Sequence, residues 1–161
     1  MEVSFPLVGR REVLPSVLTG VLCVIAGGLV AAVTAPAPTE HGTWVAAYLV
    51  LVGGVAQAGL GVGQAMFTTQ TSARVVAVEA VGWNVGNASV IVGTLLGVTA
   101  LVDLGGAFLV IALILLARGV SPGAVRPVAG GARWYLRGYR LLVLILLVSI
   151  PIGLVLARAQ P

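Results

Sequence analysis

Charged residues are scarce in this chain. They make up 9% of its 161 residues, whereas an ordinary soluble domain carries about 25%. The mean hydropathy is +1.11, and a chain so poor in charge cannot cover a water-facing surface. These values exclude a soluble enzyme, a disordered tail and a disulfide-stapled secreted module. We therefore predict an all-α fold, a polytopic bundle of membrane-spanning helices.

Cysteine and histidine occur once each, and lysine is absent. The lone Cys23 lies inside the first apolar run and cannot form an intrachain disulfide. His41 alone cannot build a zinc site, and a membrane b-type haem usually takes two axial ligands from facing helices. The chain also has no recognisable nucleophile elbow, phosphate-binding glycine loop or catalytic carboxylate pair. We therefore expect no enzymatic activity, no metal and no cofactor.

The apolar residues fall into five runs. A helix that crosses a bilayer needs about 20 apolar residues, so five crossings with short connections nearly fill the chain. We predict a single membrane domain over residues 1–161, with spans at 13–34, 44–64, 76–98, 99–117 and 139–156. A basic and aromatic link at 118–138 precedes the last span. The third and fourth spans are expected to separate near Asp103, Gly105 and Gly106.

The arginines favour one orientation. With five crossings, eight of them share one side of the membrane: Arg10, Arg11, Arg74, Arg118, Arg126, Arg133, Arg137 and Arg140. Only Arg158 lies on the opposite side. Because positively charged residues concentrate in cytoplasmic loops, we predict that the N-terminus is in the cytoplasm and the C-terminus outside. The expected location is the plasma membrane, as a multi-pass protein of a bacterial inner membrane, with the first span kept as an uncleaved anchor.

The third span carries several polar residues. In the stretch VEAVGWNVGNASV, Glu79, Trp83 and Asn87 fall within one sector of about 80° on a helix, whereas Asn84 lies further round. Carboxylates and amides are costly in hydrocarbon, so they normally face the bundle interior or a wet cavity. One interpretation is a polar site for an ion, a proton or a small ligand, with Glu79 as its titratable member. In the other, Glu79 reaches the membrane edge or meets Arg74, and the asparagines hold helices together.

The second span combines glycine with two amides. Gln57 and Gln64 are seven residues apart and share one face, and Gly59 and Gly63 form a small-xxx-small pair. Such a helix can press closely against a neighbour while its amides hydrogen-bond across the contact. Close packing is one interpretation, and a ligand-lined groove is the alternative. Both glutamines are included in the candidate intramembrane polar site.

The link before the last span alternates arginine with aromatic residues. In ARWYLRGYR, Arg133, Arg137 and Arg140 are spaced i, i+4 and i+7, so a helix would align them in one stripe beside Trp134 and Tyr139. Trp and Tyr settle at the headgroup level of a bilayer, and each nearby basic residue adds about 1 kcal/mol of attraction to anionic lipid. We predict a short interfacial helix that contacts anionic lipid headgroups. Docking to an acidic cytoplasmic partner is the alternative, and the link is too small to bind nucleic acid.

Three functional hypotheses follow. The first is a non-catalytic subunit or accessory component of a membrane complex, which packs against itself as a homo-oligomer or against a larger membrane protein. The second is a small oligomeric transporter or channel in which Glu79 and Asn87 line a polar path. The third, a haem-associated membrane protein, is disfavoured by the single histidine.

Overall fold

The computed structural model describes residues 14–67, 72–119 and 133–159, and within these ranges the chain forms helices and no strands. The helices are α1 (Leu14–Thr34), α2 (Glu40–Tyr48), η2 (Leu49–Ala56), α3 (Gln57–Phe67), α4 (Ala73–Leu96), α5 (Thr99–Gly119) and α6 (Arg133–Ala159). Because α2, η2 and α3 are continuous, the described chain has five helices that are long and apolar enough to cross a membrane. The predicted all-helical bundle with five potential spans is confirmed.

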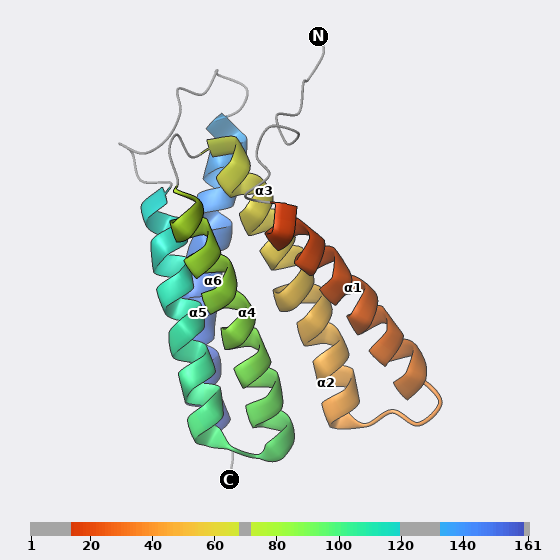
Figure 1. Ribbon diagram of the computed structural model, residues 1–161. Helices are drawn as coiled ribbons and strands as arrows, with labels where there is room; N and C mark the ends of the chain where they lie inside the picture. The colour runs from red at the N-terminus through yellow and green to blue at the C-terminus, as the bar shows by residue number, and fades with distance from the viewer. Residues whose placement is uncertain (1–13, 68–71, 120–132, 160–161) are drawn as a thin grey trace.

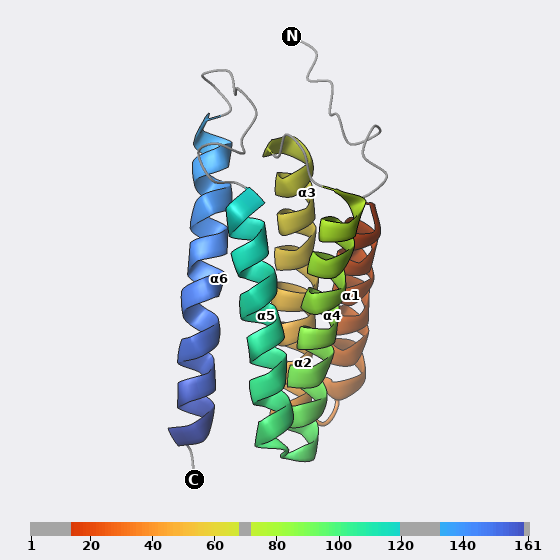
Figure 2. The same ribbon diagram turned by 60° about the vertical axis from the view of Figure 1, so that its left-hand side comes forward.

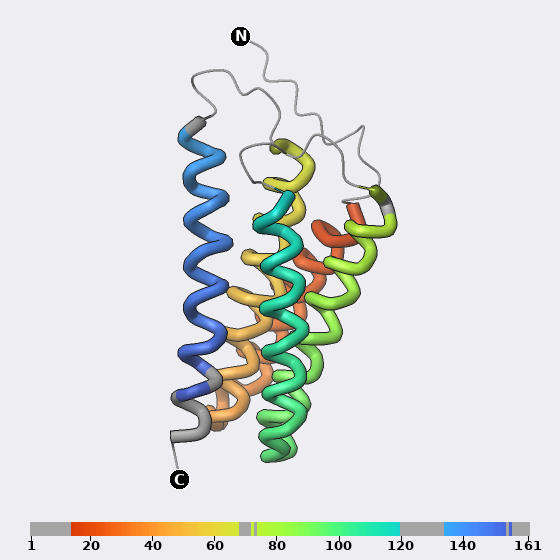
Figure 3. Tube along the Cα trace, turned by 90° about the vertical axis from the view of Figure 1, so that its left-hand side faces the viewer, coloured from red at the N-terminus to blue at the C-terminus, as the bar shows by residue number. Residues whose placement is uncertain are grey.

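The bundle consists of two antiparallel helix pairs and a fifth helix. α1 pairs with the continuous helix α2–η2–α3, and α4 pairs with α5 (Figure 1). α6 packs against α5 and α3, on the side of the bundle away from α1 (Figure 2). The start of α1 and the end of α6 lie at opposite ends of the bundle (Figure 3), as an odd number of passes requires.

The two ends of the bundle differ in charge. α1, α4 and α6 begin at one end, where α3 and α5 finish (Figure 1). We call this the arginine end, because it carries Arg74 and Arg118 in the terminal turns of α4 and α5, and Arg137 and Arg140 within the first eight residues of α6. The opposite end carries Glu40 in the first turn of α2, Asp103 near the start of α5 and a single arginine, Arg158, in the last turn of α6.

The connection between α4 and α5 lies at Gly97. This residue has φ +66°, a left-handed conformation that glycine adopts without a Cβ penalty, and it caps the C-terminal end of α4. The predicted span bounds of 76–98 and 99–117 agree with this turn. The expectation that the break lies near Asp103, Gly105 and Gly106 is wrong, because all three residues lie inside α5. Gly105 instead permits close packing, since a Cβ there would lie 2.7 Å from the carbonyl oxygen of Gly86.

The second span is not a uniform α-helix. Between Leu49 and Ala56 it is a π-helix, whose i→i+5 hydrogen bonds widen the turn. At about 100° per residue, an uninterrupted α-helix would put Tyr48 and Gln57 on opposite sides. In the structure both side chains face the bundle, because Tyr48 lines a large cavity and Gln57 is buried. η2 therefore brings the polar residues of α2 and α3 to the same face.

The last helix begins earlier than the sequence predicts. α6 runs without a break over Arg133–Ala159, so the prediction of a separate interfacial helix is wrong. Residues 120–132 of the predicted link lie outside the described residues, and the first two residues of that link belong to α5. The helix continues because Gly138 is an isolated glycine, which costs about 1 kcal/mol in a helix interior and does not end it.

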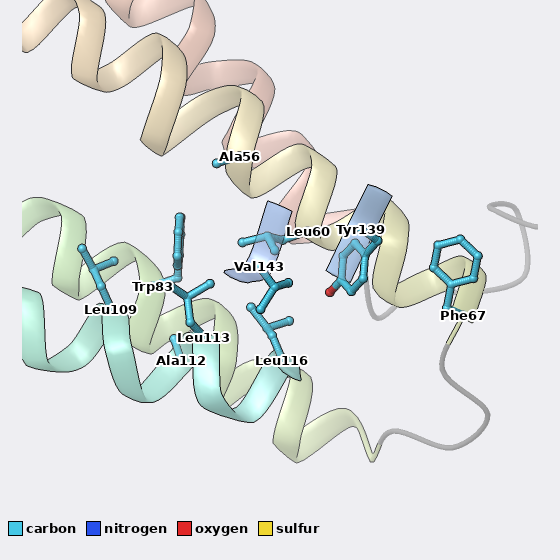
Figure 4. Close-up of a cluster of buried hydrophobic side chains, with 10 residues drawn as sticks. All are labelled: Ala56, Leu60, Phe67, Trp83, Leu109, Ala112, Leu113, Leu116, Tyr139 and Val143. Carbon is cyan, nitrogen blue, oxygen red and sulfur yellow. The ribbon is translucent and has the colours of Figure 1, made fainter. Parts of the chain in front are cut away.

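The core lies between the second span, α4, α5 and α6. Its buried side chains converge from these helices (Figure 4): Ala56, Leu60, Phe67, Trp83, Leu109, Ala112, Leu113, Leu116, Tyr139 and Val143. Among the described residues, none from α1 belongs to this cluster. α1 buries only Gly20 and Gly27, where its backbone approaches the second span. α1 is therefore a peripheral helix of the bundle.

Candidate functional site

Polar residues of α3 and α4 meet in the half of the bundle nearer the arginine end. Glu79 is only 4% exposed, and Nε2 of Gln64 donates a hydrogen bond to one of its carboxylate oxygens. Arg74, by contrast, is exposed at the start of α4. The interpretation in which Glu79 reaches the membrane edge or pairs with Arg74 is therefore wrong, because the carboxyl group is buried against α3.

Two further polar side chains beside this pair have buried atoms without a hydrogen-bond partner in the described part of the chain. Gln57 is 3% exposed and lacks a partner for both amide atoms, and the indole N–H of Trp83 is also unpaired. Gln57, Gln64, Glu79 and Trp83 all line one cavity of about 20 Å³. A water molecule needs about 10–15 Å³, so one water-sized species fits. We call these four side chains and their cavity the Glu79 site.

The remaining wall of the Glu79 site is mostly apolar and comes from four helices. It is formed by Ser16, Leu60, Gly61, Val76, Ala80 and Leu116. A buried amide without a partner costs about 1–3 kcal/mol. A bound species that hydrogen-bonds to Gln57 would remove that cost, so the cavity is a candidate binding site.

The two asparagines of α4 differ in position. Asn87 is buried one turn beyond Trp83 on the same face, and its Nδ2 donates to the Trp83 carbonyl oxygen at 2.8 Å. Its Oδ1 has no partner among the described residues. Asn84 is half-buried, and its Nδ2 donates to the Ala80 carbonyl oxygen at 2.8 Å. Both of these bonds stay within α4 and do not join helices.

Tyr139, which the sequence analysis groups with the headgroup-level aromatic residues, is buried in the core. Its ring packs over Gly63 so closely that a Cβ on this glycine would overlap the ring (the ring is drawn in Figure 4). The centroid of the Phe67 ring is 6.0 Å away, and the phenol hydroxyl has no partner within the described ranges. The small residue at position 63 was a visible sign of a close contact. Nothing in the sequence indicated which side chain would fill it.

A larger cavity opens toward the end of the bundle opposite the arginine end. It has a volume of about 560 Å³ and lies between the second span, α4, α5 and α6. Glu40 and His41 are exposed at its mouth, and the ring centroids of Trp44 and Tyr48 lie 5.1 Å apart along its wall. The deeper wall is largely aliphatic and includes Val52, Val90, Val102, Leu109, Leu146 and Ile150. We call this space the His41 cavity.

The sequence analysis did not predict the His41 cavity. Its only sign in the sequence was the spacing of His41, Trp44 and Tyr48 at intervals of three and four residues, which a helix aligns on one face. The spacing does not indicate which helices enclose the other sides of that face.

The predicted headgroup contacts lie in the first turns of α6. Trp134 is 71% exposed, and Arg137 and Arg140 are also exposed. The side chain of Arg133 lies outside the described residues. Contact between these residues and anionic lipid stays a prediction.

The described residues offer no candidate metal site beside these two cavities. Among the residues described, no group of three or more His, Cys, Asp or Glu side chains is arranged to hold a metal ion. The Glu79 site and the His41 cavity are thus the candidate functional features of the bundle. Comparison with known proteins finds no matching family model, no matching curated protein and no matching solved structure.

Proposed function

We propose that the chain is a multi-pass protein of a bacterial plasma membrane, with its N-terminus in the cytoplasm and its C-terminus outside. The support is the separation of charge along the bundle. The four arginines of the arginine end lie opposite Glu40, Asp103 and the single arginine Arg158, and positive charge concentrates on the cytoplasmic side of membrane proteins. In this orientation Arg137 and Arg140 contact anionic headgroups of the inner leaflet.

Reporter fusions test this orientation. We expect a reporter fused after Arg126 to be active in the cytoplasm and one fused after Pro161 to be active outside. The reason is that one membrane-spanning helix, Trp134–Gly153, lies between the two positions. A fluorescent protein reports location in the cytoplasm, and an export-dependent phosphatase reports location outside. Finding both fusions in one compartment would contradict the five-pass arrangement.

We propose further that the protein conducts or transports a proton or a small monovalent cation, without catalysis of its own. The buried Glu79 site is the observation that carries this proposal. An ionisable residue inside a membrane bundle is costly and usually serves function. If the polar residues served only to hold α3 against α4, the hydrogen bond between Gln64 and Glu79 would be sufficient. Gln57 adds an amide that faces the same water-sized cavity and has no side-chain or backbone partner in the described ranges.

Further polar residues support a path beyond the Glu79 site. Glu79, Trp83 and Asn87 occupy successive turns of α4, and Thr94 continues this face into the wall of the His41 cavity. Val90, which lines the His41 cavity, lies between Asn87 and Thr94, so the proposed path would have to pass an apolar side chain. This arrangement suits gated or alternating passage better than an open pore.

Ion flux into proteoliposomes tests the role of Glu79. Wild-type protein should carry protons or sodium ions faster than empty vesicles, measured with an internal pH or sodium dye under an imposed potential. Glu79→Gln should lower this flux by about tenfold or more, because the amide cannot take up and release a proton and binds a cation weakly. Asp103→Asn makes the matched change at the other end of the bundle and should leave the flux unchanged.

Two results would contradict the transport proposal. One is wild-type flux no faster than that of empty vesicles in either orientation of the gradient. The other is a Glu79→Gln variant that folds and conducts as the wild type does. Gln57→Leu gives an independent check, since it removes the unpaired amide and should also lower the flux.

A second candidate function, a non-catalytic subunit of a membrane complex, is favoured by the outer face of α1. Leu22, Leu29 and Val33 are all exposed on this helix. Lipid or another membrane helix can cover such a face. Purification in a gentle detergent separates the two functions. A stoichiometric companion protein would favour the subunit, and a homogeneous homo-oligomer would favour the transporter or channel.

A further inference from the structure

We propose that the His41 cavity binds a lipophilic cation, a molecule that carries one positive charge on an apolar body. The cavity shares no lining residue with the Glu79 site, so its occupancy can be tested apart from ion passage, although the proposed ion path reaches its wall at Thr94. Its volume of about 560 Å³ lies in the range of roughly 300–1,000 Å³ that is typical of small-molecule sites. The character of its walls then indicates what kind of molecule fits.

Charge at the mouth of the cavity favours a cation. Glu40 is the only Asp, Glu, Lys or Arg among the described residues that line the cavity, and it is exposed at the mouth. The dipole of α2 is positive at its N-terminus, but Glu40 in the first turn opposes it. The negative C-terminal end of α4, near Thr94, lies beside the positive N-terminal end of α5, near Val102, so the two helix ends oppose each other and the Glu40 carboxylate determines the sign of the charge there. The arginines of the arginine end lie at the far end of the bundle. Arg158 lies in the last turn of α6 beyond the lining residue Gly153, and its side chain is outside the described residues.

Aromatic rings line the wall next to this carboxylate. Trp44 and Tyr48 follow Glu40 at i+4 and i+8, and their ring centroids are 5.1 Å apart. The faces of Trp and Tyr rings attract a cation within about 6 Å, and more strongly where water is excluded. His41 adds a hydrogen-bonding group at the mouth. A cation entering past Glu40 would therefore meet aromatic faces before it reaches the aliphatic wall.

The aliphatic wall accounts for the apolar body of the ligand. Val52, Leu109 and Leu146 line the deeper part of the cavity, where a charged group would lose its hydration without compensation. An acyl chain would match this part but leave Glu40 and the aromatic pair without a role. An anion would be repelled at the mouth. A lipophilic cation fits both parts of the cavity.

Binding of two ions of matched shape tests the proposal. Tetraphenylphosphonium and tetraphenylborate have nearly the same size and opposite charge. The full chain in phosphatidylcholine nanodiscs, corrected for empty nanodiscs, should bind the phosphonium saturably and the borate not at all. Glu40→Gln should weaken phosphonium binding by about three- to fivefold, as for loss of an exposed ionic contact. Tyr48→Leu should weaken it by about five- to tenfold.

Control variants separate recognition from general damage. Asp103→Asn removes a carboxylate from the same end without changing the cavity wall and should leave binding unchanged. Ile150→Trp fills the cavity and should abolish binding, while circular dichroism checks that each variant is folded. Equal binding of the two ions, or unchanged binding to folded Glu40→Gln, would overturn the proposal. If neither ion binds saturably, the proposal is also overturned. Lipid or a second copy of the chain would then be the occupant of the cavity.

Discussion

Gly105→Val should lower the free energy of unfolding by about 3 kcal/mol or more, at the upper end of the costs of overpacking. A Cβ at Gly105 would lie 2.7 Å from the carbonyl oxygen of Gly86 and 2.8 Å from the amide nitrogen of Val90. Both atoms belong to the backbone of α4, so they cannot move aside as a flexible side chain can. Relief of the overlap requires α4 and α5 to separate along the most extensive helix contact of the bundle.

Unfolding in mixed micelles of a mild and a denaturing detergent measures this effect. Gly28→Val is the matched control, because Gly28 is exposed on α1 and a Cβ there has no neighbour within 4 Å. The control should change stability by less than about 0.5 kcal/mol, as is usual for surface substitutions. An equal loss in both variants would show that helix propensity, and not the contact between α4 and α5, determines the result.

Gln64→Leu should lower the free energy of unfolding by about 2–4 kcal/mol. The substitution deprives the buried Glu79 carboxyl group of the hydrogen bond that it accepts, and an unpartnered buried polar group costs about 1–3 kcal/mol, with more for a charged one. Glu79→Gln keeps an acceptor for the Gln64 amide. Its effect on stability should therefore be below about 1 kcal/mol, although it should lower the proposed ion flux by about tenfold or more.

A double-mutant cycle isolates the contribution of this pair. Glu79→Leu alone removes the acceptor that Gln64 uses, whereas the double variant Gln64→Leu/Glu79→Leu removes both partners. The loss in the double variant should be smaller than the sum of the single losses by about 1 kcal/mol or more. Gln57→Leu is the control, since it replaces a buried amide on the same helix that no described residue partners. If Gln64→Leu and Gln57→Leu lower the free energy of unfolding equally, the hydrogen bond between Gln64 and Glu79 has no special role in stability.

The features that the sequence predicts well are local ones. Each span is a run of apolar residues, and the shared face of Glu79, Trp83 and Asn87 follows from helical periodicity alone. The structure buries all three of these residues. The predicted bounds of 76–98 and 99–117 place the turn before α5 correctly, but the residues expected to cause it, Asp103 among them, lie inside α5. The backbone turns instead at Gly97, whose left-handed conformation depends on having no Cβ.

Contacts between helices could not be predicted. Hydrophobicity does not drive helices together within lipid, so apolar residues that face lipid and those that face another helix look alike in the sequence. The pairing of Gln64 with Glu79 and the packing of Tyr139 over Gly63 both depend on which helices are neighbours. The His41 cavity depends on four helices at once. These features required the three-dimensional arrangement.

The π-helical turn of the second span constrains how many residues it contains. Deleting one residue between Leu49 and Ala56 could be absorbed by a return to α-helical geometry, because eight steps of about 100° leave Tyr48 and Gln57 about 80° apart, on the same side. A second deletion would have no wide turn to absorb it and would rotate one half of the span against the other by about 100°. Either Gln57 and Gln64 would then leave the Glu79 site, or Tyr48 would leave the wall of the His41 cavity. Descendants of this chain that keep both sites can therefore lose one residue from this stretch, but they cannot lose two.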